Sequence, residues 1–452
     1  KLRIYSVSTP SNVQIATVQS LFTAPRAGAY ISINNLSFTG SNLITIDFSS
    51  SSYVSVQNCN ISFSGLDAIN VDGTNPDIEN NTISNVGNSA MRVTSNGHNA
   101  IIKSNKLRNI GIIPGTIQSW ANGSISANGD NALIQNNDND NSGYNGITFY
   151  GQNTTVKQNL VNHSNLIKDD GGGICTHQGS SGQIVGNIVL NSIGNTDGTL
   201  SLPNAPLAHG IFLDDLSNSI TISGNSIAGC GGVGIDLHRA YNVNVNNNTC
   251  YDNGTKGNWM KGAILFQCDA TDNPPIQGLN VKNNIFFAKT IDQLAFFYYL
   301  NTTNANYIKQ FGVADSNYYA RPINNDANTI LVNSTSYYIQ GWQSYSGQEA
   351  HSKGSPKSIS DTSDLLFEYN STSSSKTITL DANYIDVKGA VYNGSITLAP
   401  YSSAVLIKDG AATGGNLLPA VNPSNPVNGL DYNYYEAGSY SAIPDFSALT
   451  PV

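Results

Sequence analysis

The stretch IVGN, residues 184–187, recurs in altered form along the chain and decides the fold. Each copy has an aliphatic residue followed three positions later by an asparagine, and successive asparagines lie 22 to 38 residues apart. The asparagines are Asn81, Asn105, Asn137, Asn159, Asn187, Asn225, Asn248 and Asn284. A repeat of this length is typical of a solenoid, in which each turn packs against its neighbours.

A second short motif occurs once in each repeat: a small residue, Ile, any residue and an apolar residue, as in GITFY at 146–150 and GIFLD at 210–214. Strand alternation directs Ile147 and Ile211 inward, together with Phe149 and Leu213. The intervening residues are expected to face outward. We therefore predict an all-β protein, a right-handed parallel β-helix whose asparagines bond to one another inside tight turns.

Stacking these strands places one residue of each turn in an outward-facing column. In chain order the column is Asp72, Thr94, Asn128, Tyr150, His177, Asp214, His238 and Gln267. The next column includes Gly151, Gln178, Asp215, Arg239 and Cys268. This order rests on interpreting GTIQSW, residues 115–120, as an inserted loop and not as a strand.

Composition limits the classes of partner. The net charge is −9 and the chain has no Lys/Arg-rich run, so nucleic acid is not an expected partner. No apolar stretch reaches the roughly 20 residues that span a membrane. Five cysteines in no metal-binding spacing are expected to be buried apolar residues. The abundance of Asn, Ser, Thr, Gly and Tyr is typical of a secreted β-rich protein.

Ionisable residues from three successive turns converge on one face around the stretch KDDGGGICTHQG, residues 168–179. The acids of this group are the catalytic candidates Asp169, Asp170, Asp214 and Asp215. The substrate-binding candidates are Lys168, His177, His209, His238, Arg239, Tyr150 and Gln267. Like charges stacked on adjacent turns repel one another, so their co-location favours a functional site.

Paired carboxyl groups on this face match the needs of glycoside hydrolysis, in which one protonates the leaving oxygen and the other attacks or activates water. Acids on neighbouring turns are expected about 5 Å apart, or about 10 Å if a turn is skipped. We predict the pair Asp170 with Asp214 or Asp215. Asp169 taken alone, before a glycine-rich run, is more often a structural turn residue than a catalytic one. No cofactor is expected except Ca²⁺, which stacked carboxylates could hold.

Three regions are predicted along the chain. Residues 1–322 form the β-helix with the active site, residues 323–409 a small antiparallel β-sandwich, and residues 410–452 a linker with the start of another domain. Because that last segment is too short to bury a core, we expect further domains of the same polypeptide beyond residue 452.

The motifs KDDGGGICT, HGIFLDD and GIDLH resemble the right-handed β-helix proteins of bacterial polysaccharide-degrading systems. The spacing of the two acid pairs is most similar to glycoside hydrolase family 141, and this resemblance implies Asp169 or Asp170 and Asp214 or Asp215 as catalytic acids. The closing GLDYNYYEAGSYSAIPDFSALTPV resembles the first strand of a PA14 domain, a module linked to carbohydrate binding.

The expected function is a secreted glycoside hydrolase acting on a polysaccharide or its oligosaccharides, located outside a bacterial cell, on its surface or in the periplasm. One alternative is a polysaccharide lyase, in which Lys168, Arg239 or Ca²⁺ neutralises a uronate and His177, His238 or Tyr150 removes a proton. The other alternative is a non-catalytic glycan-binding or adhesin solenoid.

Overall fold

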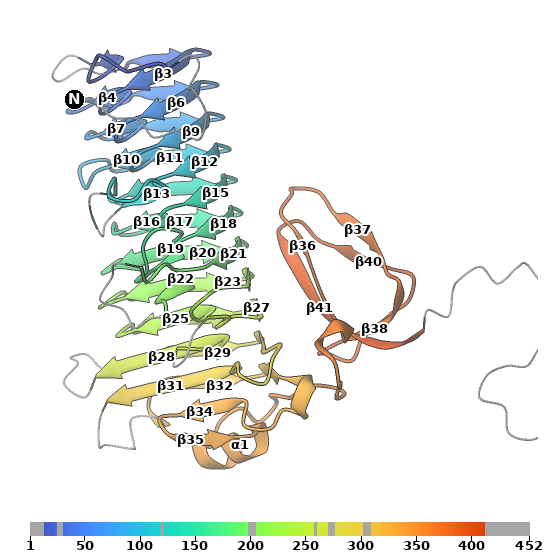
Figure 1. Cartoon of the computed structure of the whole chain (residues 1–452). Coiled ribbons are helices and arrows are strands. Elements are labelled where there is room, and N and C mark those ends of the chain that lie inside the picture. Colours follow the sequence, from blue (N-terminus) through green and yellow to red (C-terminus); the bar gives the residue numbers. More distant parts are fainter. Residues whose placement is uncertain are drawn as a thin grey trace, which may run out of the picture.

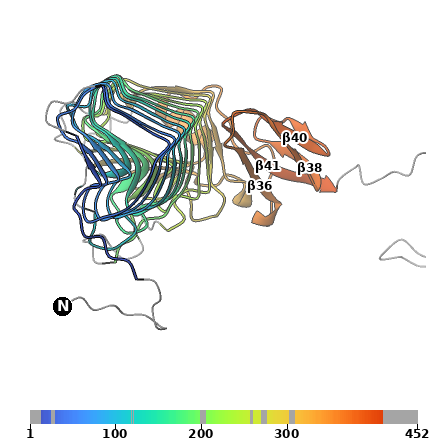
Figure 2. The same cartoon turned by 90° about the horizontal axis from the view of Figure 1, so that it is seen from above.

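The computed structural model describes residues 13–24, 30–117, 119, 122–197, 205–256, 260–269, 276–301 and 309–411. Its main body is a stack of turns, each contributing one short strand to each of three sheets that run along a common axis (Figure 1). Seen along that axis, the turns superimpose around an enclosed interior (Figure 2). This is the predicted all-β parallel β-helix.

The first sheet carries the site. Its strands, in spatial order, are β1 (Phe22–Thr23), β4 (Ile46–Phe48), β7 (Ile69–Val71), β10 (Met91–Val93), β13 (Gly123–Ala127), β16 (Asn145–Phe149), β19 (Gly171–His177), β22 (Ala208–Asp214), β25 (Ile235–His238), β28 (Ile264–Asp269), β31 (Phe296–Asn301), β34 (Ile330–Val332) and β35 (Thr335–Tyr337). All its described pairings are parallel except that between β34 and β35.

The second sheet consists of β2 (Ser32–Asn34), β5 (Ser55–Gln57), β8 (Asp77–Glu79), β11 (Ile101–Lys103), β14 (Leu133–Gln135), β17 (Thr155–Lys157), β20 (Gln183–Val185), β23 (Thr221–Ser223), β26 (Asn244–Asn246), β29 (Leu279–Lys282) and β32 (Gly312–Asp315). The third consists of β3 (Ser37–Ser41), β6 (Asn60–Ser64), β9 (Thr82–Val86), β12 (Lys106–Ile110), β15 (Asp138–Ser142), β18 (Leu160–Ser164), β21 (Ile188–Ser192), β24 (Ser226–Ala228), β27 (Thr249–Tyr251), β30 (Ile285–Phe287) and β33 (Tyr318–Ala320).

The predicted inward residues fill the interior. Ile147, Phe149, Ile211 and Leu213 are completely buried, and stacked equivalents from other turns join them in one continuous core. Because residues at i and i+2 of a strand share a face, the small–Ile–x–apolar motif supplies two core residues per turn. Each fully buried Ile, Leu or Phe side chain contributes about 1.5–3 kcal/mol to stability.

The repeated asparagines lie at the corner between the second and third sheets. The residue before each has positive φ, for example Gln158 (57°) and Gly186 (63°). Asn159 donates from Nδ2 to Oδ1 of Asn187 (2.9 Å), which also accepts from the Asn159 backbone N–H (3.0 Å). The same bonds link successive asparagines from Asn81 onward and extend beyond the predicted members to Asn317. Each buried amide is thereby satisfied within the corner.

The solenoid extends further along the chain than predicted. Strand β34 lies beyond the expected boundary at residue 323, yet it pairs in parallel with β31. The helices η2 (Pro322–Asn324) and α1 (Ile339–Ser346) flank this last turn. At its end, Glu349 and Ser352 bond to Asn317 and close the row of asparagines. The sequence missed this because the capping turn lacks the Asn-bearing motif.

After η3 (Thr362–Asp364), the C-terminal strands are antiparallel. One sheet contains β36 (Leu365–Asn370), β41 (Ser402–Ala411), β38 (Ala382–Asp386) and β39 (Val391–Tyr392), and the other β37 (Lys376–Thr379) and β40 (Ser395–Leu398). The residues of the predicted PA14-like segment lie outside the described part, apart from 410 and 411. No described helix is long and apolar enough to cross a membrane.

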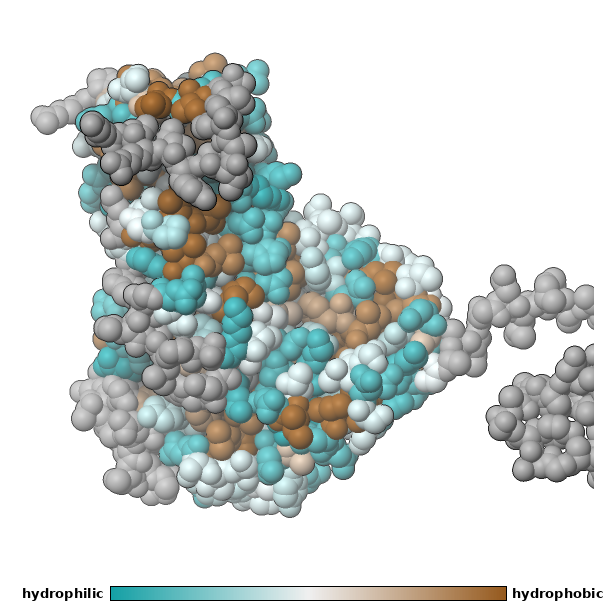
Figure 3. Space-filling view, viewed as in Figure 1, coloured by the Kyte–Doolittle hydropathy of each residue, from teal (hydrophilic) through white to brown (hydrophobic). Residues whose placement is uncertain are grey.

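The C-terminal domain packs against the outer surface of the third sheet (Figures 1 and 2). The rings of Tyr251 in β27 and Phe367 in β36 stack with centroids 5.0 Å apart. Val405 and Ile407 of β41 join the same apolar cluster as Leu190 of β21. In the space-filling view, the domain and the lower solenoid form one continuous body (Figure 3). This docking leaves the first sheet uncovered by the domain.

Candidate active site

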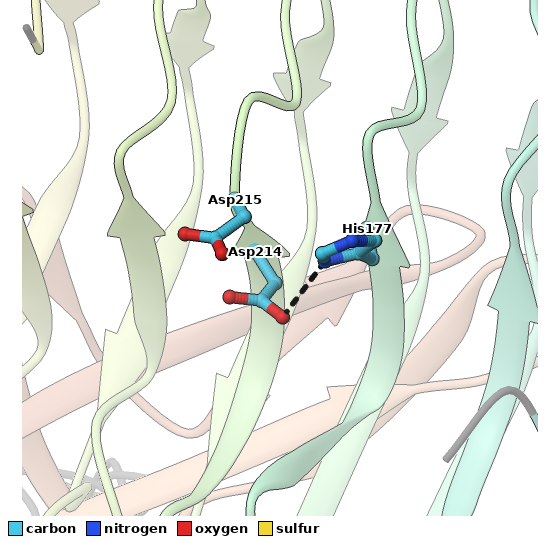
Figure 4. Close-up of side chains that lie close together, drawn as sticks. All are labelled: His177, Asp214 and Asp215. Carbon is cyan, nitrogen blue, oxygen red and sulfur yellow. Dashed lines mark hydrogen bonds and ion pairs between the residues drawn. The ribbon is translucent and has the colours of Figure 1, made fainter. Parts of the chain in front are cut away.

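The outward-facing column predicted from the sequence is present in the strand register. His177 of β19 pairs with Asp214 of β22, and His238 of β25 pairs with Gln267 of β28. Since Leu213 pairs with Leu237, Asp214 also lies beside His238. Asp214 and Asp215 project from the end of β22 while His177 reaches toward them from β19 (Figure 4). The described part of 115–120 contains no strand, in agreement with the loop interpretation.

A pocket of about 600 Å³ opens on this face. Its described lining is Ser119, Tyr144, Tyr150, Asp170, Cys175, His177, Gln178, Phe212 and Asp214. Two carboxyl groups therefore face one space, and no Lys or Arg is among these lining residues. Phe212 was not predicted, although its place between the inward Ile211 and Leu213 identifies an outward side chain.

Asp170 enters the pocket from the opposite end of β19 to His177. Asp214 is in register with His177 at one end of β19, whereas Asp170 precedes the other end. Simple stacking of turns therefore does not set the separation of the two acids. Asp170 has positive φ (57°), and its carbonyl accepts a hydrogen bond of 2.6 Å from the hydroxyl of Tyr144. These contacts fix the backbone from which the Asp170 side chain extends.

The glycines that follow Asp170 are required by close packing. A Cβ at Gly171 would lie 2.2 Å from Oδ1 of Asn145, and one at Gly173 would lie 2.3 Å from Cγ1 of Val189. Asn145 Oδ1 also accepts from the Gly172 N–H (2.8 Å). The DDGGG motif thus combines a tight strand entry with a carboxyl group of the pocket.

The protonation of Asp170 differs from that of an ordinary aspartate. Desolvation within the pocket, together with the nearby charges of Asp214 and Asp169, raises the pKa of Asp170 to about 6. Solvent still reaches the residue, which is exposed at the pocket mouth. About half of Asp170 is therefore protonated at pH 6 and about a tenth at pH 7, far more than for an ordinary aspartate.

Asp214 has the opposite shift. Burial alone would raise its pKa, but hydrogen bonds from His238, the Asp215 backbone and His177 outweigh burial and lower the pKa below the usual 3.8. Oδ1 lies 2.8 Å from His238 Nδ1, and Oδ2 lies 3.2 Å from His177 Nδ1. Asp214 is therefore ionised at neutral pH.

His238 supplies the compensating positive charge. Burial disfavours its charged form, yet the hydrogen bond to Asp214 and the charges of Asp236, Asp214 and Asp215 raise its pKa to about 9. Its ring is nearly parallel to that of Phe212, at 6.4 Å. Arg239 donates from Nη1 to Asp215 Oδ1 (3.0 Å), so the second acid of the LDD motif is paired as well.

His209 does not reach the pocket surface, contrary to its prediction as a substrate-binding residue. It is 1% exposed, and Phe212 and the segment at Gly232 and Val233 lie against its ring. The Val233 N–H donates to its Nδ1 (3.2 Å), which places the proton on Nε2, 3.3 Å from Asp236 Oδ2. Burial lowers the pKa of His209 to about 3 and raises that of Asp236 to about 8. Both groups are then neutral at pH 7.

Three further candidates lie around the pocket without lining it. Asp169 is buried, and among the described residues its Oδ2 has no hydrogen-bond partner. Lys168 places its ammonium 5.4 Å from the centre of the Tyr144 ring, and burial lowers the pKa of this lysine. Gln267 is half-buried on the next turn, beside His238. Tyr150 does line the pocket, and burial raises the pKa of its hydroxyl well above the usual value.

His177, Asp214 and Asp215 present ligand atoms within 4.8 Å of one another (Figure 4). This set does not match Ca²⁺, which takes six to eight oxygen ligands. Asp214 and Asp215 already accept hydrogen bonds from His238 and Arg239, so each carboxylate has a cationic partner within the protein. These residues therefore suit a site whose carboxylates are balanced by cationic side chains of the protein better than they suit a calcium site.

The fold and pocket define a parallel β-helix with an acidic site on the outer face of its first sheet. A family model described as the right handed beta helix region matches residues 108–336, half of the chain, and the chain belongs to this family. No curated protein matches the sequence.

Several solved structures have a similar fold at low sequence identity. The Dettilon tailspike protein is 12% identical, with a TM-score of 0.45 over 82% of this chain and 69% of that one. The catalytic unit of a GH87 alpha-1,3-glucanase from Streptomyces thermodiastaticus is 15% identical, with a TM-score of 0.42 over 71% and 52%. A pectate lyase is 11% identical, with a TM-score of 0.36 over 69% of each chain.

Proposed function

We propose that the protein is a glycoside hydrolase that cleaves a polysaccharide or its oligosaccharides with Asp170 and Asp214. The observation that supports this most directly is that two carboxyl groups with opposite pKa shifts line one pocket. Paired groups whose environments separate their pKa values are the usual arrangement for acid and base roles in one site.

In this mechanism, Asp170 is the general acid. Its proton moves to the glycosidic oxygen as the bond from the anomeric carbon to that oxygen breaks. Asp214, ionised between two histidines, stabilises the developing positive charge and attacks the anomeric carbon or takes a proton from water. Water supplies the new hydroxyl group at the anomeric carbon, and Asp170 is reprotonated for the next cycle.

The remaining pocket residues bind and position the sugar. His177 and Gln178 offer hydrogen-bonding groups, and Tyr150 offers a ring surface on which a sugar can pack. Asp215, held by Arg239, is assigned to fixing the end of β22 and not to proton transfer. We further propose, from the motif resemblance, a relationship to glycoside hydrolase family 141 and action outside a bacterial cell.

A polysaccharide lyase is the second candidate, and the charged His238 with Arg239 is the observation that favours it. These cations could bind a uronate carboxylate while His177 removes the neighbouring proton. Against this, both cations are already bonded to Asp214 and Asp215. The lining itself is acidic, which disfavours an acidic sugar in the pocket.

The test is digestion of a panel of neutral and acidic polysaccharides, with reducing ends and ultraviolet absorbance measured together. The hydrolase produces reducing ends without ultraviolet absorbance, because no double bond forms. Equal growth of both signals would establish the lyase. Binding without either signal, with the same affinity in Asp214→Ala, would establish the glycan-binding solenoid.

A further inference from the structure

A second depression, of about 570 Å³, lies on another side of the molecule, at the corner between the second and third sheets. Three parts of the chain form it: the solenoid corner, the capping segment 350–353 and the turn between β38 and β39. We call it the basic corner and define it by Asn247, Asn283, His351, Lys353 and Lys388.

The basic corner contains two lysine ammonium groups and several other hydrogen-bonding side chains. Its described lining contains one histidine and two lysines but no acid, although the whole chain has 30 acids against 21 Lys and Arg. Lys353 and Lys388 are exposed and form no ion pair or hydrogen bond through their side chains within the described residues. Unpaired donors that face one space favour an anionic ligand.

A carboxylate beside the depression, that of Asp315, is already paired. Asp315 accepts from the backbone N–H of His351 (2.8 Å) and from its Nδ1 (2.7 Å). Because Nδ1 donates this bond, the imidazole is held with Nε2 available to a ligand. Asp315 therefore orients His351. The ammonium groups of Lys353 and Lys388 remain available to a ligand in the depression.

The solenoid adds a regular row of polar groups. Asn247, Asn283 and Ser316 have positive φ (57°, 58° and 60°) and occupy the same corner position in three successive turns. Equivalent positions in adjacent parallel strands lie about 4.8 Å apart. The two amides have no partner within the described residues, so their N–H groups and oxygens can meet the hydroxyls of a linear ligand.

We propose that the basic corner binds the anionic groups, carboxylate or sulfate ester, of an acidic saccharide. That the ligand is anionic follows from the lysines and hydrogen-bond donors of the basic corner. That it is a saccharide rests on the proposed function. Lys388 belongs to the C-terminal domain and Lys353 to the solenoid cap, so the site exists because the domain is docked. It provides an anchoring site separate from the carboxylate pocket.

The experiment measures binding to the full chain by calorimetry, with oligogalacturonate, a sulfated galacto-oligosaccharide, a neutral xylo-oligosaccharide and inorganic sulfate as probes. The test variant is Lys353→Gln with Lys388→Gln. The control is Lys106→Gln with Lys408→Gln, which removes one exposed lysine from the solenoid and one from the C-terminal domain.

We expect at least one acidic oligosaccharide to bind, and the test variant to weaken that binding by about tenfold or more, since each lost contact is charge-assisted. The control variant should bind as tightly as the wild type. The test variant should turn over any substrate at the wild-type rate. Binding of the oligogalacturonate would identify the anionic group as a carboxylate, and binding of the sulfated galacto-oligosaccharide would identify it as a sulfate ester. Equal binding of the neutral probe, equal weakening in the control, or binding of inorganic sulfate as tightly as any oligosaccharide would overturn the proposal. Because binding is measured directly, the result does not depend on whether Asp170 and Asp214 catalyse hydrolysis.

Discussion

Asp214 and His238 lie at the ends of neighbouring strands, with Oδ1 and Nδ1 2.8 Å apart. The bond joins two groups whose pKa values move in opposite directions, downward for Asp214 and upward to about 9 for His238. The register of β22 and β25 therefore places an ion pair at the candidate site, with Asp214 lining the pocket. Both stability and catalysis should depend on it.

Replacing His238 by Gln should change how stability depends on pH. The pKa of His238 is raised from 6.5 to about 9, so its contribution is complete below pH 6.5 and is lost as pH rises through 9. The shift corresponds to about 3 kcal/mol. In His238→Gln, the fall of the thermal midpoint across this window should be reduced.

His163→Gln is the matched control, because His163 forms a more exposed pair with Asp140 at 2.8 Å. It should leave the pH dependence nearly unchanged, since exposed pairs contribute about 0–1 kcal/mol. Identical pH profiles for wild type and His238→Gln would contradict a charged, half-buried His238.

Asp214→Asn should reduce kcat on any hydrolysed substrate by about a thousandfold, because the amide cannot carry the negative charge. The fold should persist, since the Asn oxygen still accepts from His238. Asp140→Asn, which also removes a carboxylate bonded to a histidine, should retain kcat. A loss below tenfold in Asp214→Asn, with an unchanged circular dichroism spectrum, would remove Asp214 from the mechanism.

Asp236→Asn should stabilise the protein above neutral pH. Asp236 is buried and its pKa is raised from 3.8 to about 8. Between pH 3.8 and pH 8 the carboxyl group is therefore ionised in the unfolded chain but not in the folded protein, and this difference lowers the stability of the fold. The Asn substitution removes that effect and keeps an acceptor for His209. Thermal midpoints at pH 4.5 and pH 8 should show a clearly larger gain at the higher pH. A loss at pH 8 would mean that Asp236 is ionised and needed.

Asn187→Ala should destabilise the solenoid strongly. The change leaves the Asn159 amide groups and the Val156 carbonyl without their buried partner, and each unsatisfied group costs about 1–3 kcal/mol. Denaturant unfolding should show a loss of several kcal/mol. Asn153→Gly, at an exposed corner with φ of 56°, should change stability by less than about 1 kcal/mol. Similar losses in the free energy of unfolding for both variants would show that a buried asparagine of the row contributes no more than an exposed corner residue.

The solenoid and its outward column follow from local sequence, because strand alternation and a residue repeat determine which side chains share a face. The grouping of Asp214, His177 and His238 is therefore predictable from the order of residues in each repeat. The burial of His209 depends on a loop inserted between strands, and the position of Asp170 in the pocket depends on the path of the chain before β19. The periodicity of the sequence encodes neither of these. The end of the solenoid was likewise missed, because β34 lacks the motif that defines the other turns.

The central claim is that Asp170 donates a proton and Asp214 carries the essential negative charge. The measurement that tests it most directly compares kcat/KM for two glycosides that share one sugar, one with an activated aryl leaving group and one with a sugar leaving group. Asp170→Asn should retain most activity on the aryl glycoside, which needs no protonation, and lose about a hundredfold or more on the other. Asp214→Asn should lose both. Equal losses on the two glycosides in Asp170→Asn would contradict the account.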